Sequence, residues 1–288
     1  MNLEDYIQGK SMMKLGRLQN LIAANPVSPW RILAITFTNK AAGELKERLA
    51  GTLGEDAQDI HASTFHSACV RILRTCIDTI GYGNNFTIYD SDDSQKAMKA
   101  CMKELKISEK NFPVKQVLAA VSTAKDEMIF PEDYESQYGS DYKQVVIAKL
   151  YKAYQERLQA ANALDFDDLI CQTVRIFETY PEVLEKYQKK YRYILVDEYQ
   201  DTNHAQYRLV SLLAQKYGNL CVVGDDDQSI YRFRGADIQN ILSFEEQFPD
   251  CRTIRLEENY RSTQHILNAA NSVIANNKAR KNKKLWTS

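Results

Sequence analysis

The sequence predicts an α/β protein in which a parallel sheet is interrupted by an all-helical insertion. Short apolar runs alternate with amphipathic helical stretches before residue 89 and again after residue 163. This alternation is typical of a parallel sheet with crossover helices. The residues in between, 89–163, follow the helical period almost throughout, which indicates a helical subdomain inserted into the sheet domain.

The part before the insertion contains two predicted strand–helix units. Residues 30–37 (WRILAITF) are expected to form a short buried strand, and the amphipathic helix after it has Thr38 or Asn39 as its N-cap. Residues 59–65 (DIHASTF) are expected to form the next strand and residues 66–80 (HSACVRILRTCIDTI) the next helix. Because a helix follows each strand, the strands are expected to be parallel.

The part after the insertion repeats this alternation. Its segments are YRYILVDE, HAQYRLVSLLAQKYG, NLCVVGDD, ADIQNILSFEEQF and RTIRLEEN. Residues 262–284 follow as one further amphipathic helix that runs into a basic end, for which a solvated tail is the simplest interpretation. No strand comes after this helix, so the fold is expected to be cut off there.

The composition of the 288-residue chain is that of an intracellular, soluble globular protein. Hydrophobic residues make up 44% and charged residues 26% of the sequence, so a large core can form. The formal net charge is −1, so any site for nucleic acid must rest on local residues rather than on an overall positive field. The six cysteines include no CxxC pair, which favours reduced thiols over disulfides or a zinc site. The N-terminus has no apolar signal core, and no stretch is long enough to cross a membrane.

The most informative string begins where the predicted strand 193–196 (YILV) ends. Asp197 and Glu198 follow it directly, at the sheet edge where α/β proteins bind their ligands. In phosphate-transferring ATPases an acid at this place holds Mg²⁺, usually through water, and the next acid can orient or activate the attacking water. A lone Asp-Glu pair would more simply begin a solvated loop. Here, however, the string continues to Thr202 as DEYQDT.

Six ordered blocks, including this string, resemble the motifs of the UvrD/Rep/PcrA-like family of superfamily one helicases. The blocks are ITFTNKAAGELKERL, STFHSACVRILR, LDFDDLI, DEYQDT, VVGDDDQSIYRFRGAD and LEENYRST. Six blocks in family order and spacing are far more specific than one short motif. The resemblance implies a RecA-like P-loop NTPase core in residues 1–88 and 164–257. It further implies that 89–163 is a helical insertion subdomain and that 258–288 is the incomplete start of a second motor core.

The resemblance implies a role in ATP hydrolysis for several residues. Asp197 would coordinate Mg²⁺, and Glu198 would be the catalytic base or the group that orients the attacking water. Gln228 would sense the γ-phosphate and report it to the DNA groove. Arg261 would reach the γ-phosphate as a finger from the second motor core, where its charge offsets the negative charge of the transition state. Arg234 would also face the phosphates, with a surface ion pair as the alternative reading.

The resemblance also implies a groove for single-stranded DNA. Aromatic rings stack on any base and so hold a strand without reading its sequence. The aromatic candidates are Phe37, Phe65, Tyr231, Phe233 and, with an imidazole ring, His66. Three polar residues could bond phosphates, namely Thr38, Asn39 and Thr64. Taken singly, an aromatic residue at a strand end is more often part of the core.

The phosphate-binding loop departs from the family pattern. Gly9, Lys10 and Ser11 stand at the family's distance from the first predicted strand, so Lys10 would bind the β- and γ-phosphates and Ser11 would ligate Mg²⁺. The residues before them are not small, however, and Glu4 takes the place of the first glycine with Asp5 beside it. Such a loop works through backbone N–H groups that converge on phosphate. Because two acids there put negative charge where phosphate should bind, the sequence does not decide whether this loop binds nucleotide.

Two main functions are therefore expected. The first is an ATP-dependent 3′-to-5′ DNA helicase, or single-stranded-DNA-dependent ATPase, that uses ATP and Mg²⁺ and is present as a fragment truncated at both ends and impaired in hydrolysis. The second is a non-catalytic remnant that binds single-stranded DNA or a partner; the helicase part of a helicase–nuclease is a third reading. The expected partners are single-stranded DNA, duplex/single-strand junctions and loading proteins of repair or replication, in the bacterial cytosol at the nucleoid and not at a membrane.

Overall fold

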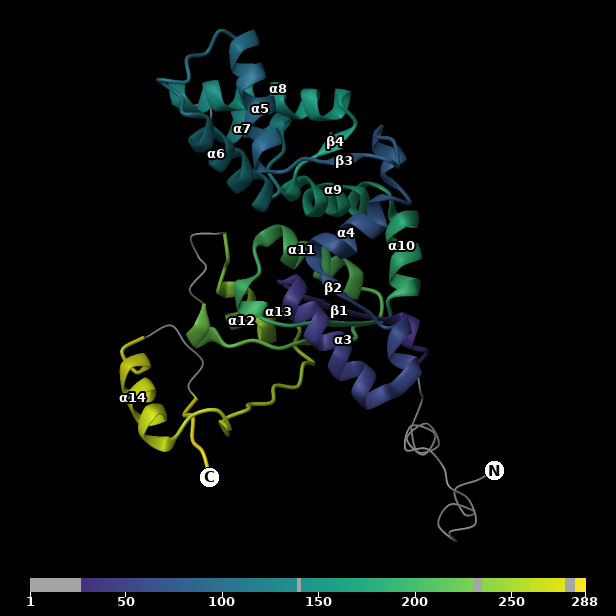
Figure 1. The fold of residues 1–288 in the computed structure, drawn as a ribbon, viewed down its shortest axis with the longest axis vertical. Coiled ribbons are helices and arrows are strands. Elements are labelled where there is room, and N and C mark those ends of the chain that lie inside the picture. The colour runs from purple at the N-terminus through teal and green to yellow at the C-terminus, as the bar shows by residue number, and fades with distance from the viewer. Residues whose placement is uncertain (1–26, 139–140, 230–234, 278–282) are drawn as a thin grey trace.

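The computed structural model of the chain describes residues 27–138, 141–229, 235–277 and 283–288. Figure 1 shows a helical body at one end of the long axis and a sheet with its helices in the middle. The chain then continues to a helix near the C-terminus that lies to one side of the sheet. The predicted α/β fold class with a parallel sheet is confirmed.

Four parallel strands form the main sheet of the described residues, in the order β2-β1-β5-β6. Their bounds are β1 Ile32–Thr36, β2 His61–Thr64, β5 Tyr193–Val196 and β6 Leu220–Val222. The register pairs Thr36 with Thr64 and pairs Val196 with Ile35 on one side and Val222 on the other. The carboxyl ends of the strands therefore reach the same edge of the sheet, and the residues after each strand are brought together there.

Helices connect the strands, and all but the first of them pack into the core on one side of the sheet. They are α3 Asn39–Leu53, α4 Phe65–Leu73, α9 Phe166–Thr179, α10 Pro181–Lys190 and α11 His204–Ala214. Apolar residues of β1 and β5, including Leu33, Ile35 and Ile194, join residues of α4, α9 and α11 in one continuous hydrophobic core. Burial of this apolar surface is the main term that holds the helices against the sheet.

Strand β5 is covered on only one face by the described residues. Ile194 and Val196 are each 1% exposed, whereas Tyr193 and Leu195 are 39% and 41% exposed. An unbroken apolar run of this kind is typical of a strand buried on both faces, but in the described part of the chain one face of β5 is open. The run YILV fits a half-covered strand as well, because apolar residues can occupy the open face without disturbing the ladder.

The first helices begin where threonine side chains cap them. Of the two predicted caps it is Thr38, not Asn39, that caps α3, with its Oγ1 accepting a hydrogen bond from the backbone N–H of Ala41 at 3.1 Å. Thr64 caps α4 in the same way through Ser67 N at 3.2 Å. Phe65 is therefore the first residue of α4, not the last residue of a strand. The helix predicted over 66–80 also ends early, at Leu73, and a separate 3-10 turn follows.

The segment RTIRLEEN, predicted as a strand, is not part of a sheet in the described residues. Ile254 and Leu256 are 68% and 80% exposed, and only Glu258 makes a single parallel bridge, to Trp286. A strand needs a partner on at least one side to satisfy its backbone. The apolar alternation alone could not show whether a partner was present.

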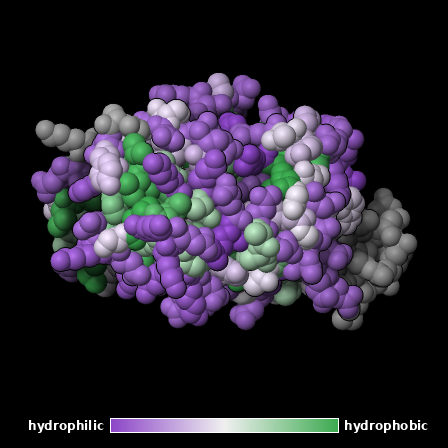
Figure 2. All heavy atoms as spheres, turned by 90° about the horizontal axis from the view of Figure 1, so that it is seen from above, coloured by the Kyte–Doolittle hydropathy of each residue, from purple (hydrophilic) through white to green (hydrophobic). Residues whose placement is uncertain are grey.

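The insertion forms a helical body with its own core. Its helices are α5 Ser91–Glu104, α6 Val114–Asp126, α7 Pro131–Tyr138 and α8 Tyr142–Ala160. Met98, Leu150 and Tyr154 are fully buried among them. Seen from this end of the molecule, most of the surface is hydrophilic, and the hydrophobic areas gather toward two opposite sides of the view (Figure 2). The apolar stripes of the helices thus face one another.

A short two-stranded ladder closes the base of the insertion. Strands β3 Thr87–Ile88 and β4 Ala163–Leu164 pair in parallel where the chain leaves the sheet domain and returns to it. The sequence did not reveal them, because two residues show no periodicity, so Ala163 was assigned to an all-helical range. The pairing brings the entry and the exit of the insertion side by side (Figure 1).

The remaining elements follow β6. Two single helical turns, α12 Gln239–Leu242 and α13 Phe244–Gln247, lie beside the sheet, and α14 Gln264–Ile274 stands apart from it (Figure 1). In the described ranges, no helix combines the length and the apolar character that crossing a membrane requires.

Candidate functional site

The polar residues predicted for the site follow the carboxyl ends of the parallel strands. Asp197 and Glu198 come directly after β5, and Asp225 lies three residues after β6. Thr38 and Thr64 stand at the ends of β1 and β2, as the caps of the helices that follow. Because the four strands are parallel and in register, these residues occupy one edge of the sheet, the usual place for a ligand in this kind of fold.

The chain turns sharply out of β5 at the two acids. The backbone N–H of Asp197 still donates to Ile35 O at 3.0 Å, which continues the ladder with β1. Glu198 then adopts a left-handed conformation with φ of 53°, and its N–H donates to Asp197 Oδ1 at 3.0 Å. A non-glycine residue in this region costs about 1–3 kcal/mol and persists only where the surroundings impose it. Both acids are exposed at the end of this turn.

Gln200 links the turn after β5 to the loop after β6. Its side chain is 1% exposed. Its Nε2 donates to Glu198 Oε2 at 2.8 Å, and its Oε1 accepts from the backbone N–H of Asp225 at 2.9 Å. An added Cβ at Gly224 would lie 2.6 Å from Gln200 Oε1, so glycine is required for this close approach. Gln200 therefore fixes the carboxylate of Glu198 relative to the neighbouring strand end.

The loop after β6 organises itself around Asp225. Its carboxylate accepts from the N–H of Asp227 at 2.9 Å and from Gln228 Nε2 at 2.8 Å. Partial burial would raise the pKa of Asp225, but hydrogen bonds from Lys283 and Gln228 hold it below its ordinary value. The predicted phosphate sensor Gln228 is thus connected to Glu198 through Asp225 and Gln200.

Three consecutive carboxylates, Asp225, Asp226 and Asp227, are close enough together to hold one ion. Lys283 lies among them, with Nζ 3.2 Å from Asp226 Oδ1, 3.3 Å from Asp227 Oδ2 and in closer contact with Asp225. These bonds raise the pKa of Lys283, although its partial burial opposes the shift. The lysine therefore satisfies this cluster in its charged form.

Asp197 has the properties that a Mg²⁺ ligand needs. Mg²⁺ prefers carboxylate and water oxygens, and the Asp197 carboxylate is exposed at the strand end. One of its oxygens accepts from Glu198 N. In the described part of the chain no lysine or arginine forms an ion pair with it. Its second oxygen can thus bind a cation, and the residues present fit this metal.

The aromatic residues after β1 and β2 differ in accessibility. Phe37 is partly exposed, and its ring centroid lies 5.3 Å from that of Phe65. Phe65 is 1% exposed and belongs to the hydrophobic core. As the first residue of α4, Phe65 points under the helix, so its ring is not available to stack on a base. The assignment of Phe65 to the DNA groove is therefore not supported by the structure.

Most of the polar residues after β1 and β2 are engaged in capping the helices that follow. Thr38 and Asn39 are exposed at the start of α3, and the Thr38 hydroxyl is engaged as the N-cap. Thr64 is buried, and its hydroxyl bonds both the backbone and the side chain of Ser67. Thr64 thus supports α4, whereas Asn39 stays exposed to solvent.

An exposed aromatic ring that we did not predict lies beside His66. Phe166, the first residue of α9, is 53% exposed, and its ring centroid is 5.5 Å from the His66 ring in an edge-on arrangement. Burial lowers the pKa of His66, so its ring is neutral near pH 7. Phe166 was part of the block LDFDDLI, but only its exposure in the structure distinguishes it from a core residue.

Arg261 is not in contact with the other predicted catalytic residues. It lies in the turn before α14, where its backbone N–H donates to Asn259 Oδ1 at 3.0 Å, and its side chain is exposed. Within the described ranges it makes no ion pair with Asp197 or Glu198. Its role stays a prediction. The predicted residues Gly9, Lys10, Ser11, Tyr231, Phe233 and Arg234 lie outside the described residues.

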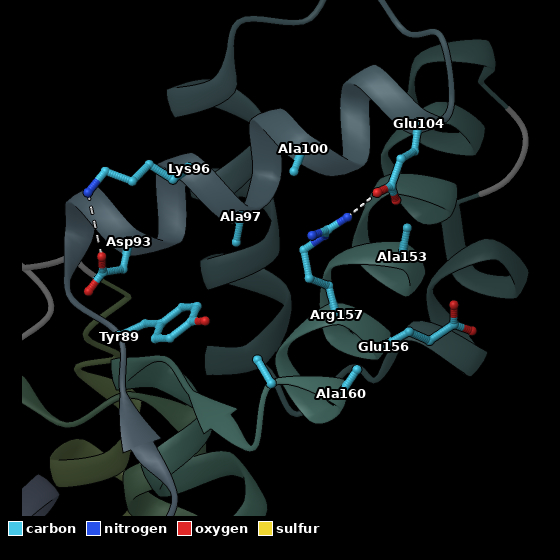
Figure 3. A pocket seen from close by; sticks show the side chains of 11 residues that line it. Tyr89, Asp93, Lys96, Ala97, Ala100, Glu104, Ala153, Glu156, Arg157 and Ala160 are labelled. Atoms are coloured by element: carbon cyan, nitrogen blue, oxygen red, sulfur yellow. Dashed lines mark hydrogen bonds and ion pairs between the residues drawn. The ribbon is translucent and has the colours of Figure 1, made fainter.

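A hollow of about 770 Å³ lies in the insertion, between α5 and α8 (Figure 3). Alanines of both helices line it, and an ion pair between Arg157 and Glu104 bridges one side. Lys96 pairs with Asp93 at 3.7 Å at the other end. None of the predicted catalytic residues reaches this hollow, so it is separate from the strand-end site.

The sequence matches a family model described as the UvrD/REP helicase N-terminal domain over residues 8–249. The similar proteins include the ATP-dependent DNA helicase PcrA of Bacillus subtilis (strain 168) and the proteins of that name from Staphylococcus epidermidis and Staphylococcus aureus (strain Mu50). Each is 54% identical to this chain over 279 residues, which is 97% of this chain. The chain spans 38% of the length of these relatives.

Proposed function

Because the chain belongs to the UvrD/REP helicase family, we propose that it supplies the ATP-hydrolysing and DNA-binding part of a 3′-to-5′ DNA helicase. Its curated relatives are named ATP-dependent DNA helicases. The substrate would be single-stranded DNA and its junctions with duplex, in the bacterial cytosol, with loading proteins of repair or replication as partners. Mg²⁺ would accompany ATP.

The observation that carries this proposal is the connection between Glu198 and the loop after β6. Gln200 donates to the Glu198 carboxylate at 2.8 Å and accepts from Asp225 N at 2.9 Å. A carboxylate held in this way can accept a proton from an attacking water without first having to find its orientation. The loop that carries Gln228 is tied to the same side chain, so a change at one strand end reaches the other.

Each acid at the end of β5 has a separate task in this proposal. Asp197 would hold Mg²⁺, which supplies positive charge to the phosphate oxygens when bound. Glu198 orients the attacking water and takes its proton, and Gln228 responds to the γ-phosphate. Lys10 and Ser11 complete the phosphate site, and the arginines Arg234 and Arg261 offset charge that develops during transfer.

The DNA-binding part of the proposal rests on exposed groups at the ends of β1 and β2. Phe37 and Phe166 offer partly exposed rings on which bases can stack. Asn39 and the N-terminus of α3 offer donors to phosphate. Tyr231 and Phe233 are proposed to add further stacking, and His66 a polar contact. None of these contacts distinguishes one base from another, which suits a strand that must move.

Steady-state ATP hydrolysis, with and without single-stranded DNA, tests the proposal. Glu198→Gln keeps the size of the side chain but removes the base, so hydrolysis should fall about 10²- to 10⁴-fold while nucleotide binding stays. Lys10→Ala should abolish both binding and hydrolysis. Glu135→Gln, an exposed acid of the insertion, is the matched control. Unchanged hydrolysis in Glu198→Gln would rule out the assigned role.

A non-catalytic DNA-binding protein is the second candidate. Glu4 and Asp5 favour it, because they put negative charge into the loop that should receive phosphate. This candidate predicts single-strand binding that requires Phe37 and Phe166 and does not respond to ATP. Titration of a fluorescent oligonucleotide with and without ATP separates the two candidates. Binding that ATP weakens or strengthens would favour the motor.

A further inference from the structure

Among the contacts between the helical insertion and the sheet domain, those of the last two residues of α6 reach two different parts of the sheet domain. Lys125 is 1% exposed and forms ion pairs with Asp165 at 2.7 Å and with Asp168 at 2.9 Å. Those two acids form the capping box at the start of α9, where the chain returns from the insertion. Lys125 thereby fastens α6 to α9.

Asp126 points the other way, toward the loops after β5 and β6. Its Oδ1 accepts from Asn203 Nδ2 at 2.5 Å. Its Oδ2 lies where it would be 2.8 Å from a Cβ added at Gly235, which itself has a φ of 81°. Glycine at this position both permits the left-handed backbone and leaves room for the carboxylate. Asp126 is thus fitted between the two loops.

The turn at Thr202 and Asn203 is the place where these loops meet. The Thr202 carbonyl accepts from Asp237 N at 2.9 Å and from Asn240 Nδ2 at 3.0 Å. Asn203 caps α11 by accepting from Gln206 N at 2.9 Å. Asp126 adds a contact from the insertion, so three parts of the chain are joined at two buried residues.

We propose that Asp126 is a positioning residue that couples the helical insertion to the catalytic edge of the sheet through the Thr202–Asn203 turn. This inference rests on the proposed function, because Glu198 and Gln200 immediately precede the turn. A displacement of α6 moves Asn203, and the short chain between Asn203 and Gln200 passes the displacement to the Glu198 carboxylate. DNA that displaces the insertion would then alter the alignment of the water-orienting group.

Asp126 is not needed merely to attach the insertion. The buried ion pairs of Lys125 and the β3–β4 ladder already hold the insertion to the sheet domain. A group kept only for attachment would not need to contact the two loops that carry the catalytic and phosphate-sensing residues. The geometry therefore distinguishes attachment by Lys125 from coupling by Asp126.

Exchanging the donor Asn203 and the acceptor Asp126 tests the coupling. Asn203→Asp keeps a good N-cap for α11 but sets two carboxylates against each other. Asp126→Asn combined with Asn203→Asp restores one donor and one acceptor, with their positions exchanged. At pH 8, amide exchange of residues 199–206 should rise roughly tenfold in Asn203→Asp and return toward the wild-type rate in the reversed pair. Glu127→Gln, one residue further along and exposed, is the control.

The same variants should separate coupling from folding in the ATPase assay. Asn203→Asp should lower the DNA-stimulated kcat roughly tenfold, within the range of coupling energies between connected sites, with little change in KM for ATP. The reversed pair should recover most of kcat. A reversed pair that recovers neither exchange nor kcat would overturn the coupling. A wild-type chain without hydrolysis would instead contradict the proposed function, and the exchange rates alone would then decide whether Asp126 holds the turn.

Discussion

Two clusters in the molecule have the same chemistry, one lysine among aspartates, but occur in different surroundings. At the base of the insertion, Lys125 pairs with Asp165 and Asp168, whose side chains are 11% and 0% exposed. After β6, Lys283 lies among three consecutive aspartates and is itself 16% exposed. The first cluster joins two helices, and the second joins a strand-end loop to a segment near the C-terminus.

Burial makes the first cluster a permanent part of the fold. Tyr154 donates to Asp165 at 3.0 Å, and Gln155 donates to Asp168 at 3.1 Å, so the carboxylates have partners beyond the lysine. Burial opposes charge on every member, yet the charge of Lys125 and the hydrogen bonds to Asp165 hold the pKa of that carboxyl below its ordinary value. Burial and the neighbouring Asp165 raise the pKa of Asp168 to about 6.

The second cluster can change partners. Asp225 keeps more than a quarter of its side chain exposed, at 27%, and the segment 283–288 contains no helix or strand of its own. Water and small ions can therefore replace Lys283 at Asp225, whereas Asp226 and Asp227 are only 8% and 13% exposed. The comparison teaches that a lysine between carboxylates makes no fixed contribution to the stability of the fold. Burial decides whether the ion pair is structural or exchangeable.

The largest expected effect is from Lys125→Met. The substitution leaves two buried carboxylates without their cation, which should cost about 3–5 kcal/mol in the free energy of unfolding. Urea unfolding of the purified variant measures it. Asp168→Asn added to Lys125→Met should recover part of the loss, because it removes one uncompensated charge. A loss of unfolding free energy below about 1 kcal/mol is typical of an exposed pair. That result would show that the two clusters do not differ in their contribution to stability.

A control for this prediction is available in the same insertion. Lys96 also pairs with an aspartate, but its side chain is 77% exposed. Lys96→Met should therefore change stability by only a few tenths of a kcal/mol, about the value of an exposed helical ion pair. Equal losses for Lys96→Met and Lys125→Met would show that the substitution, not the burial, causes the effect.

An intermediate effect is expected at Asp126, a carboxylate with an amide partner instead of a lysine. Burial, reinforced by Asp167 and Glu127, raises the pKa of Asp126 to about 7. The folded protein thus binds this proton more tightly than the unfolded chain does. The resulting stabilisation is complete below pH 4 and is lost as the pH rises to about 7.

Comparison of wild type with Asp126→Asn at several pH values measures this contribution. From pH 5 to pH 8 the wild type should lose on the order of 1–2 kcal/mol relative to the variant, less than the full linkage value because water reaches part of the carboxylate. Glu135→Gln should show a much smaller pH-dependent difference, since Glu135 is exposed and does not contribute to the raised pKa of Asp126. A difference between wild type and Asp126→Asn that does not vary with pH would contradict the raised pKa.

Periodicity explains how much of the fold could be predicted. The alternation of strands and helices, the helical insertion and the cap at Thr38 follow from local patterns, and the structure contains them. The pairing of the two-residue strands β3 and β4, and the lack of a sheet partner for RTIRLEEN among the described residues, depend on tertiary contacts that no local pattern reports. Lys125 could have been found, because it follows Val121 by four residues on the buried face of α6.

The candidate site was predicted in position but not in detail. Parallel strand ends placed Asp197 and Glu198 at one edge, as expected from the string after YILV. Burial could not be read from residue type, so Phe65 was assigned to the groove and Phe166 was overlooked. The bonds of Gln200 join residues 25 positions apart, and only the folded chain shows them. The roles of these residues in hydrolysis and DNA binding stay predictions.

The smallest expected effect is from Lys283→Met in the exchangeable cluster. Because the Asp225 carboxylate, the closest partner of Lys283, stays 27% exposed to water and cations, the loss should be about 1 kcal/mol or less. It should also shrink as salt rises from about 0.05 M to 0.5 M, since ions screen accessible charges far more than buried ones. Lys284→Met, an exposed neighbour, is the control, and Lys125→Met should show no comparable salt dependence. A salt-independent loss of several kcal/mol for Lys283→Met would mean that both clusters are structural, and that the loop after β6 is locked rather than exchangeable.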